Sequence, residues 1–164
     1  MVTPSRAAPR HGPDFYAGDD YVIDESYGYL VRRLHASLQR HIERRMQPLD
    51  LTAMQWAPLL LLAEGKADTG AELARWMNID TGAMTRMLDR LEGKGLLERR
   101  RCAADRRVVR LILTSEGEAA VARVPAILAE VLNLHLAGFE AAELSTLMGY
   151  LHRMLDNGAR EEPA

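Results

Sequence analysis

The 164-residue chain contains one cysteine, Cys102, so it cannot form an internal disulfide bond, and such usage is typical of a reducing compartment. It lacks any apolar run near the roughly 20 residues that span a bilayer, and no apolar secretory segment stands at its N-terminus. We therefore expect a cytoplasmic protein with no membrane partner. Aromatic residues make up only 5% of the chain, so Leu, Ala, Val and Met must fill the core, which favours helices.

Motifs for catalysis and for metal or cofactor binding are absent as well. The sequence holds no G-x-S-x-G, Walker or G-x-G-x-x-G pattern, and its histidines define no catalytic triad. It has no C-x-x-C or H-E-x-x-H motif, and the spacing of His35 and His41 makes their side chains diverge around a helix. We expect no enzymatic activity, no metal site and no cofactor.

Apolar residues at helical spacing predict a mainly α chain that begins with a proline-containing arm. From Leu30 to Met46 they recur every four positions, and Pro48 should end this helix. A capping-box pattern at residues 52–55 predicts a second helix, in which Pro58 should introduce a kink.

Two further N-cap patterns predict a helix-turn-helix. Thr69 with Glu72 should cap a short helix over residues 70–77, and Asp80 should cap a helix over residues 81–94 that Gly95 ends. A tight turn joins the two helices. This outline is typical of DNA-binding domains.

The pattern after Gly95 changes from helical to strand-like. β-prone residues at 96–99 and 108–113 flank an arginine-rich segment, which predicts two antiparallel strands with a charged tip. Thr114 should then cap a long helix to about residue 137, bent near Pro125, and a last helix should cover residues 141–156. The helices at the two ends of the chain carry more apolar residues than a monomer of this size needs.

Charge is segregated along the chain. The stretch from Arg86 to Arg110 holds nine basic and four acidic residues, a net charge of +5, while the chain as a whole carries −2. A basic stripe on an acidic body indicates an anionic partner surface.

This order of elements resembles that of the MarR family of winged-helix regulators, and two local motifs carry the resemblance. Residues 79–95 read IDTGAMTRMLDRLEGKG, close to that family's recognition-helix pattern VDxGAxTRMLDRLxxKG. The Asp-Arg-Arg element at residues 105–107, followed by Leu-Thr at 113–114, is similar to the family's wing. The resemblance covers residues 26–157.

The resemblance implies a mainly α fold of the winged-helix (α+β) class with a helical dimerisation hub. We expect a flexible N-terminal arm over residues 1–23, a dimerisation region formed by residues 24–48 and 115–158, and a winged helix-turn-helix DNA-binding domain over residues 50–114. The implied function is that of a homodimeric repressor that binds a palindromic operator in double-stranded DNA.

The residues expected to contact DNA lie on the recognition helix and in the wing: Thr81, Thr85, Arg86, Arg90, Arg99, Arg100, Arg101, Asp105, Arg106 and Arg107. Arg and Thr side chains read guanine and thymine edges in the major groove. In the wing, the resemblance places Arg107 in the minor groove, and Asp105 would orient an arginine fork. Asp89 is expected to pair with Arg86 or Arg90 within its helix. The alternative is that the basic hairpin is only a solvated surface.

The resemblance also implies an effector, because many members of the family bind small aromatic or phenolic anions. The family's carboxylate contacts map onto Thr85, Arg90 and Arg99, which equally suit phosphate contacts. A second candidate pocket has Trp56 as a wall, with His35, His41 or Arg44 as the anion partner. Trp56 equally suits a place in the core.

Two other functions stay open at this point. Cys102 follows three arginines, which favour its thiolate, so a redox-responsive regulator is one alternative, against a plain exposed loop thiol. A winged-helix adaptor that does not bind DNA is the other.

Overall fold

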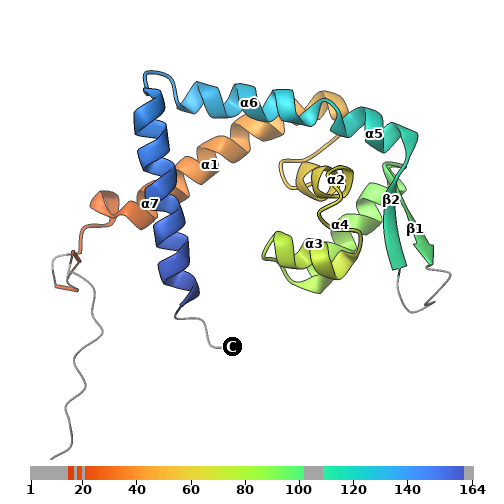
Figure 1. Ribbon diagram of the computed structural model, residues 1–164, viewed down its shortest axis with the longest axis horizontal. Helices are drawn as coiled ribbons and strands as arrows, with labels where there is room; N and C mark the ends of the chain where they lie inside the picture. The colour runs from red at the N-terminus through yellow and green to blue at the C-terminus, as the bar shows by residue number, and fades with distance from the viewer. Residues whose placement is uncertain (1–14, 17, 20, 102–108, 161–164) are drawn as a thin grey trace, which may run out of the picture. The chain divides into compact units, whose positions relative to one another are not determined.

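The computed structural model describes residues 15–16, 18–19, 21–101 and 109–160 (Figure 1). The chain divides into two units, Met1–Ser37 and Leu38–Ala164. The elements are, in chain order, η1 (Ile23–Glu25), α1 (Tyr27–Met46), η2 (Gln47–Leu49), α2 (Trp56–Ala63), α3 (Gly70–Trp76), α4 (Thr81–Gly93), β1 (Leu97–Arg101), β2 (Val109–Leu113), α5 (Ser115–Val121), α6 (Val124–His135) and α7 (Ala141–Ala159). None of the helices in this described part has the length and apolar character that crossing a membrane requires.

The expected fold class, mainly α with a small sheet, is confirmed. Strands β1 and β2 pair antiparallel, with Leu97 opposite Leu113 at one end and Arg101 opposite Val109 at the other. The helix-turn-helix pair α3–α4 packs together, and β1 packs on α4 (Figure 1). The order of helices and strands is therefore that of a winged helix.

Side-chain caps begin α3 and α4 where the sequence placed them, whereas the capping box predicted at residues 52–55 does not begin α2, which starts at Trp56 with no side-chain cap. Thr69 and Glu72 form a complete capping box at the start of α3. Asp80 accepts the amide hydrogen of Ala83 at 2.8 Å, and Gly95 follows α4 in the left-handed conformation, with a φ of 69°. These local contacts fix where α3 and α4 begin and where α4 ends.

Two helix predictions need correction. Helix α2 begins at Trp56 and runs without a break, because Pro58 lies in its first turn, where an amide has no helical partner to lose. The long helix expected after Thr114 is two helices, α5 and α6, and Pro125 lies at the start of the second. Because Pro125 has no amide hydrogen to donate to the preceding turn, the chain ends α5 and begins α6 here, and no single bent helix forms.

A continuous apolar core fills the unit Leu38–Ala164 and joins α1 through α6. Its most deeply buried side chains come from the end of α1, from the three helices α2–α4, from β1 and from α6: Met46, Leu59, Leu73, Met84, Leu91, Leu97, Val124 and Val131. Because α3, α4 and β1 all contribute to one core, the helix-turn-helix and the root of the wing are held together.

Helices α6 and α7 expose many apolar side chains. Leu132 on α6 is 47% exposed, and no residue of α7 is buried. In the other unit, Leu30 and Leu34 on α1 are about half exposed. Apolar area of this extent on helices is typical of an interface with another chain.

The tight approach of α5 to the residue before β1 yields a prediction at Gly117. A Cβ at this position would overlap the carbonyl oxygen of Leu96 and lie 2.9 Å from its carbonyl carbon, whereas a Cβ on Gly93 would meet nothing within 4 Å. We expect Gly117→Ala to lower the free energy of unfolding by about 1–3 kcal/mol. Gly93→Ala should raise it by up to about 1 kcal/mol, since alanine favours helix.

Urea denaturation of the two variants beside the unaltered chain measures both changes. Equal midpoints for Gly117→Ala and Gly93→Ala would show that the Leu96 contact does not constrain residue 117.

Candidate nucleic-acid interface

Helix α4 has one buried face and one exposed polar face. Met84, Leu88 and Leu91 are at most 3% exposed and pack into the core. The exposed side chains are those that the sequence predicted for base contact: Thr81, Thr85, Arg86 and Arg90. The 3.6-residue period of the helix places the two sets on opposite faces, so burial of the first set forces the second set outward.

The first turn of α4 packs closely against its own N-cap. A Cβ on Gly82 would lie 3.1 Å from Oδ1 of Asp80 and 3.6 Å from Nη1 of Arg86. The hydroxyl of Thr85 donates to the carbonyl oxygen of Thr81 at 2.8 Å. This bond leaves the hydroxyl lone pairs and the methyl group of Thr85 for a partner, a combination that suits an amino-bearing base edge or a thymine methyl.

Arg99 is held by two carboxylates of α4, so the expected pairing of Asp89 with Arg86 or Arg90 is wrong. The Arg99 guanidinium lies 2.8 Å from Asp89 and also pairs with Glu92, while its backbone amide donates to Glu92 at 3.2 Å. The Arg99 side chain is only 28% exposed. Residue 99 therefore ties strand β1 to the recognition helix.

The other described arginines of the wing differ in their surroundings. Arg100 pairs with Glu98 on its own strand, and Arg110 pairs with Asp68, the residue that precedes the cap of α3. Arg101 ends β1 with an exposed side chain. The wing thus combines arginines that bridge elements with arginines that face solvent.

Several predicted residues lie outside the described part of the chain. These are the wing residues Asp105, Arg106 and Arg107, proposed for the DNA backbone and minor groove, and Cys102, the candidate redox thiol.

The second candidate effector set falls on different parts of the chain. His35 belongs to the unit Met1–Ser37, whereas the other three residues belong to the unit Leu38–Ala164. Trp56 lies at the start of α2, and its Nε1–H is buried with no hydrogen-bond acceptor in the described part of the chain. A buried donor without a hydrogen-bond acceptor costs about 1–3 kcal/mol of folding free energy. The Trp56 Nε1–H is therefore suited to donate a hydrogen bond to an acceptor on a ligand.

His41 contacts a residue that the sequence did not single out. Its ring meets that of His135 edge to face, with 5.3 Å between centroids. Burial, followed by the charges of His135, Arg45, Arg40 and Arg44, lowers the pKa of His41 below its usual value. A lower pKa disfavours the charged imidazolium, which is the form of His41 that would pair with an anion. Nothing in the spacing of the sequence pairs residues 41 and 135.

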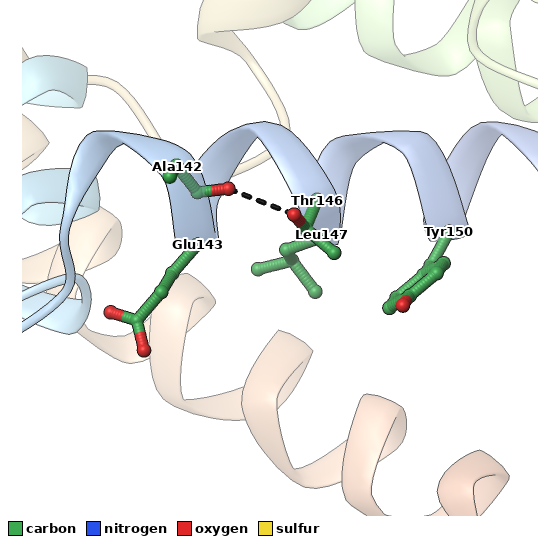
Figure 2. A pocket seen from close by; sticks show the side chains of 5 residues that line it. All are labelled: Ala142, Glu143, Thr146, Leu147 and Tyr150. Atoms are coloured by element: carbon green, nitrogen blue, oxygen red, sulfur yellow. Dashed lines mark hydrogen bonds between the residues drawn. The ribbon is translucent and has the colours of Figure 1, made fainter.

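Two hollows on the described surface are lined by other residues. One, of about 360 Å³, lies on α7 and is lined by Ala142, Glu143, Thr146, Leu147 and Tyr150, with Thr146 hydrogen-bonded to the carbonyl oxygen of Ala142 (Figure 2). The other, of about 400 Å³, is lined by Lys66, Glu72, Arg75 and Trp76. Neither includes a residue predicted to bind an effector.

Comparison with protein families gives a match to the model described as the MarR family over residues 51–109. This range begins just before α2 and ends at the first residue of β2.

Solved structures match over most of the chain. The reduced form of MarR from E. coli is 30% identical, with 79% of this chain and 96% of that chain covered and a TM-score of 0.69. A mutant MarR from E. coli complexed with operator DNA is 31% identical, with coverage of 78% and 92% and a TM-score of 0.72. The transcriptional regulator SlyA, 22% identical, covers 80% of this chain and 93% of its own, with a TM-score of 0.75, and supports the fold alone.

Proposed function

Because the chain belongs to the MarR family, we propose that it is a repressor that binds a palindromic DNA operator as a homodimer and responds to a small aromatic or phenolic anion. Membership alone makes it a winged-helix transcriptional regulator. The repressor role, the dimer and the effector go beyond membership. The observation that carries DNA binding is the exposed polar face of α4, opposite a buried apolar face.

The DNA-binding part of the proposal assigns α4 to the major groove. Arg86 and the threonines would meet base edges there, while Arg101 and the wing residues Arg106 and Arg107 would meet phosphates or the minor groove. The relative from E. coli that was solved with operator DNA supports this assignment. Arg99, held by Asp89 and Glu92, is assigned to the support of the wing.

The dimer is supported by the exposed apolar side chains outside the DNA-binding lobe. We assign residues 24–48 and 115–158 to the dimerisation hub and residues 50–114 to DNA binding. On α7, Met148, Leu151, Met154 and Leu155 are all at least 37% exposed. A second copy would cover this surface, and a two-fold dimer would present two recognition helices to a palindrome.

The effector part of the proposal is supported by Trp56. Its buried, unpartnered Nε1–H is suited to donate to a carboxylate or phenolate oxygen, and its ring offers a face for an aromatic group. Binding at the junction of α2 with the rest of the chain would shift the population away from the form that fits the operator.

We further propose that the chain has no catalytic activity and acts in the cytoplasm, as suits a transcription factor. A winged-helix adaptor is an outcome of the tests below, and a redox-responsive regulator acting through Cys102 is the alternative to a ligand-responsive one.

The first prediction from this proposal concerns base recognition by Arg86. In gel shifts with the DNA that flanks its own gene, Arg86→Ala should weaken specific binding by roughly 1–3 kcal/mol and leave binding to random DNA nearly unchanged. Arg160→Ala, which removes an exposed arginine that lies in neither the DNA-binding nor the dimerisation region, serves as the control and should bind as the unaltered chain does. An equal loss on both DNAs would reduce Arg86 to a phosphate contact.

Salt dependence in the same assay separates a DNA-binding protein from an adaptor. Log K should fall with log [salt] by about 0.9 for each phosphate contact. A flat response would favour the adaptor.

The second prediction concerns the dimer. Leu151→Glu places a charge in the exposed apolar face of α7, so the mass in solution should fall from twice 18.3 kDa to the monomer value. Gly149→Glu puts the same charge on the opposite side of α7, where an added Cβ would meet nothing within 4 Å, and should keep the dimer. Light scattering after size exclusion measures both, and a monomeric unaltered chain would contradict the proposed dimer.

The third prediction concerns the effector. An aromatic carboxylic acid that binds should raise the melting temperature and weaken the gel shift, since a ligand stabilises the form it prefers. Trp56→Phe keeps the ring but removes the donor, and should lose most of that rise. The matched control is Trp76→Phe, at an indole that is 60% exposed. Equal responses of the two variants to a panel of aromatic acids would remove Trp56 from the effector site.

A further inference from the structure

Two arginines lie directly opposite each other in the wing. Arg100 on β1 is the cross-strand partner of Arg110 on β2, and like charges in this arrangement destabilise a strand pair. Each arginine has its own carboxylate. Arg100 pairs with Glu98 two residues earlier on the same strand, whereas Arg110 pairs with Asp68, which precedes α3. The second pairing joins distant parts of the chain.

Asp68 connects α3 to β2 through three of its groups. Its amide donates to the Glu72 carboxylate in the capping box of α3 at 3.0 Å. Its carbonyl oxygen accepts the amide hydrogen of Leu111 at 2.8 Å, and its carboxylate pairs with Arg110. Since Leu111 is only 5% exposed, the backbone bond is shielded from water, and the ion pair lies at its solvent edge.

We propose that Asp68 and Arg110 form a lock that sets the direction of the wing relative to the helix-turn-helix, so that Arg110 is a positioning residue and not a DNA contact. This inference rests on the proposed function in DNA binding. The lock has a counterpart on the other strand, where Arg99 ties β1 to α4 through Asp89 and Glu92. Each strand of the wing is thereby tied to one helix of the helix-turn-helix.

Because both side chains of the pair are about half exposed, its role is to orient the wing and not to stabilise the fold. The Arg110 and Asp68 side chains are 50% and 44% exposed, and ion pairs of this kind add little to folding free energy. A charge-assisted hydrogen bond between a guanidinium and a carboxylate still restricts the orientation of the two groups that it joins. An arginine that is already neutralised by a carboxylate also adds little net attraction for phosphate.

Asp68→Asn distinguishes the two roles of Arg110 because the two roles predict opposite changes in the affinity for DNA. If Arg110 contacted phosphate, loss of the competing carboxylate would tighten DNA binding. If the lock positions the wing, Asp68→Asn should raise the Kd for operator DNA by about three- to tenfold, and Arg110→Ala should do the same. The double variant should lose no more than either single one, since both remove one interaction.

Gel shifts over a range of salt concentrations test the proposal, with Glu64→Gln as the matched control. That change removes one carboxylate four residues before Asp68, at the C-cap of α2, and breaks the pairing of Glu64 with Lys66, so it reports how loss of one negative charge alone affects DNA binding. The salt slope should be the same for Arg110→Ala and the unaltered chain, whereas loss of a phosphate contact would lower it by about 0.9. A thermal melt of each variant confirms that it folds.

The outcomes separate the lock from the function on which it rests. Weaker binding by both single variants, with no further loss in the double variant, supports the lock. Tighter or equal binding by Asp68→Asn, while the unaltered chain and Glu64→Gln bind DNA, overturns the lock alone. Failure of the unaltered chain to bind DNA overturns the proposed function together with the lock.

Discussion

Burial of the apolar face of α4 is the constraint on which the rest of the site depends. With Met84, Leu88 and Leu91 in the core, the helix has only one orientation, and its polar face must meet solvent or a partner. The caps at Asp80 and Gly95 limit where the helix begins and ends. A short helix that is oriented by packing and bounded by caps presents its side chains in a fixed pattern, which recognition of base edges requires.

The arginines of the wing divide by what holds them. Arg99 and Arg110 each bridge a strand to a helix through carboxylates, while Arg101 stays exposed. A cluster of like charges would repel itself, and here the acids that lower the repulsion also connect the elements. The same residue type therefore supports the scaffold at some positions and leaves charge available for an anionic partner at others.

Local signals in the sequence predicted most of the fold. They did not predict the contacts between elements that are distant in the chain. Thr69, Asp80 and Thr114 were identified as N-caps because a cap and the amide it accepts from lie three residues apart. Pro125 was expected to bend one helix, but it separates α5 from α6. The loss of one amide hydrogen can have either result, and the sequence does not distinguish them. The pairing of Arg99 with Asp89, the pairing of Arg110 with Asp68 and the contact of His41 with His135 depend on packing, which no spacing in the sequence encodes.

The close contact at Gly117 has a mechanical consequence. The first turn of α5 rests on the backbone of Leu96, and the Thr114 amide donates to that same carbonyl oxygen at 3.2 Å. Because Gly117 has no side chain to separate the two backbones, a displacement of α5 is transmitted directly to Leu96, where the wing begins. The interruption at residues 122–123, between α5 and α6, is flanked on both sides by core residues, since Val121 and Val124 are at most 6% exposed. A load on α5 is therefore carried by the Leu96 backbone and by the apolar core together.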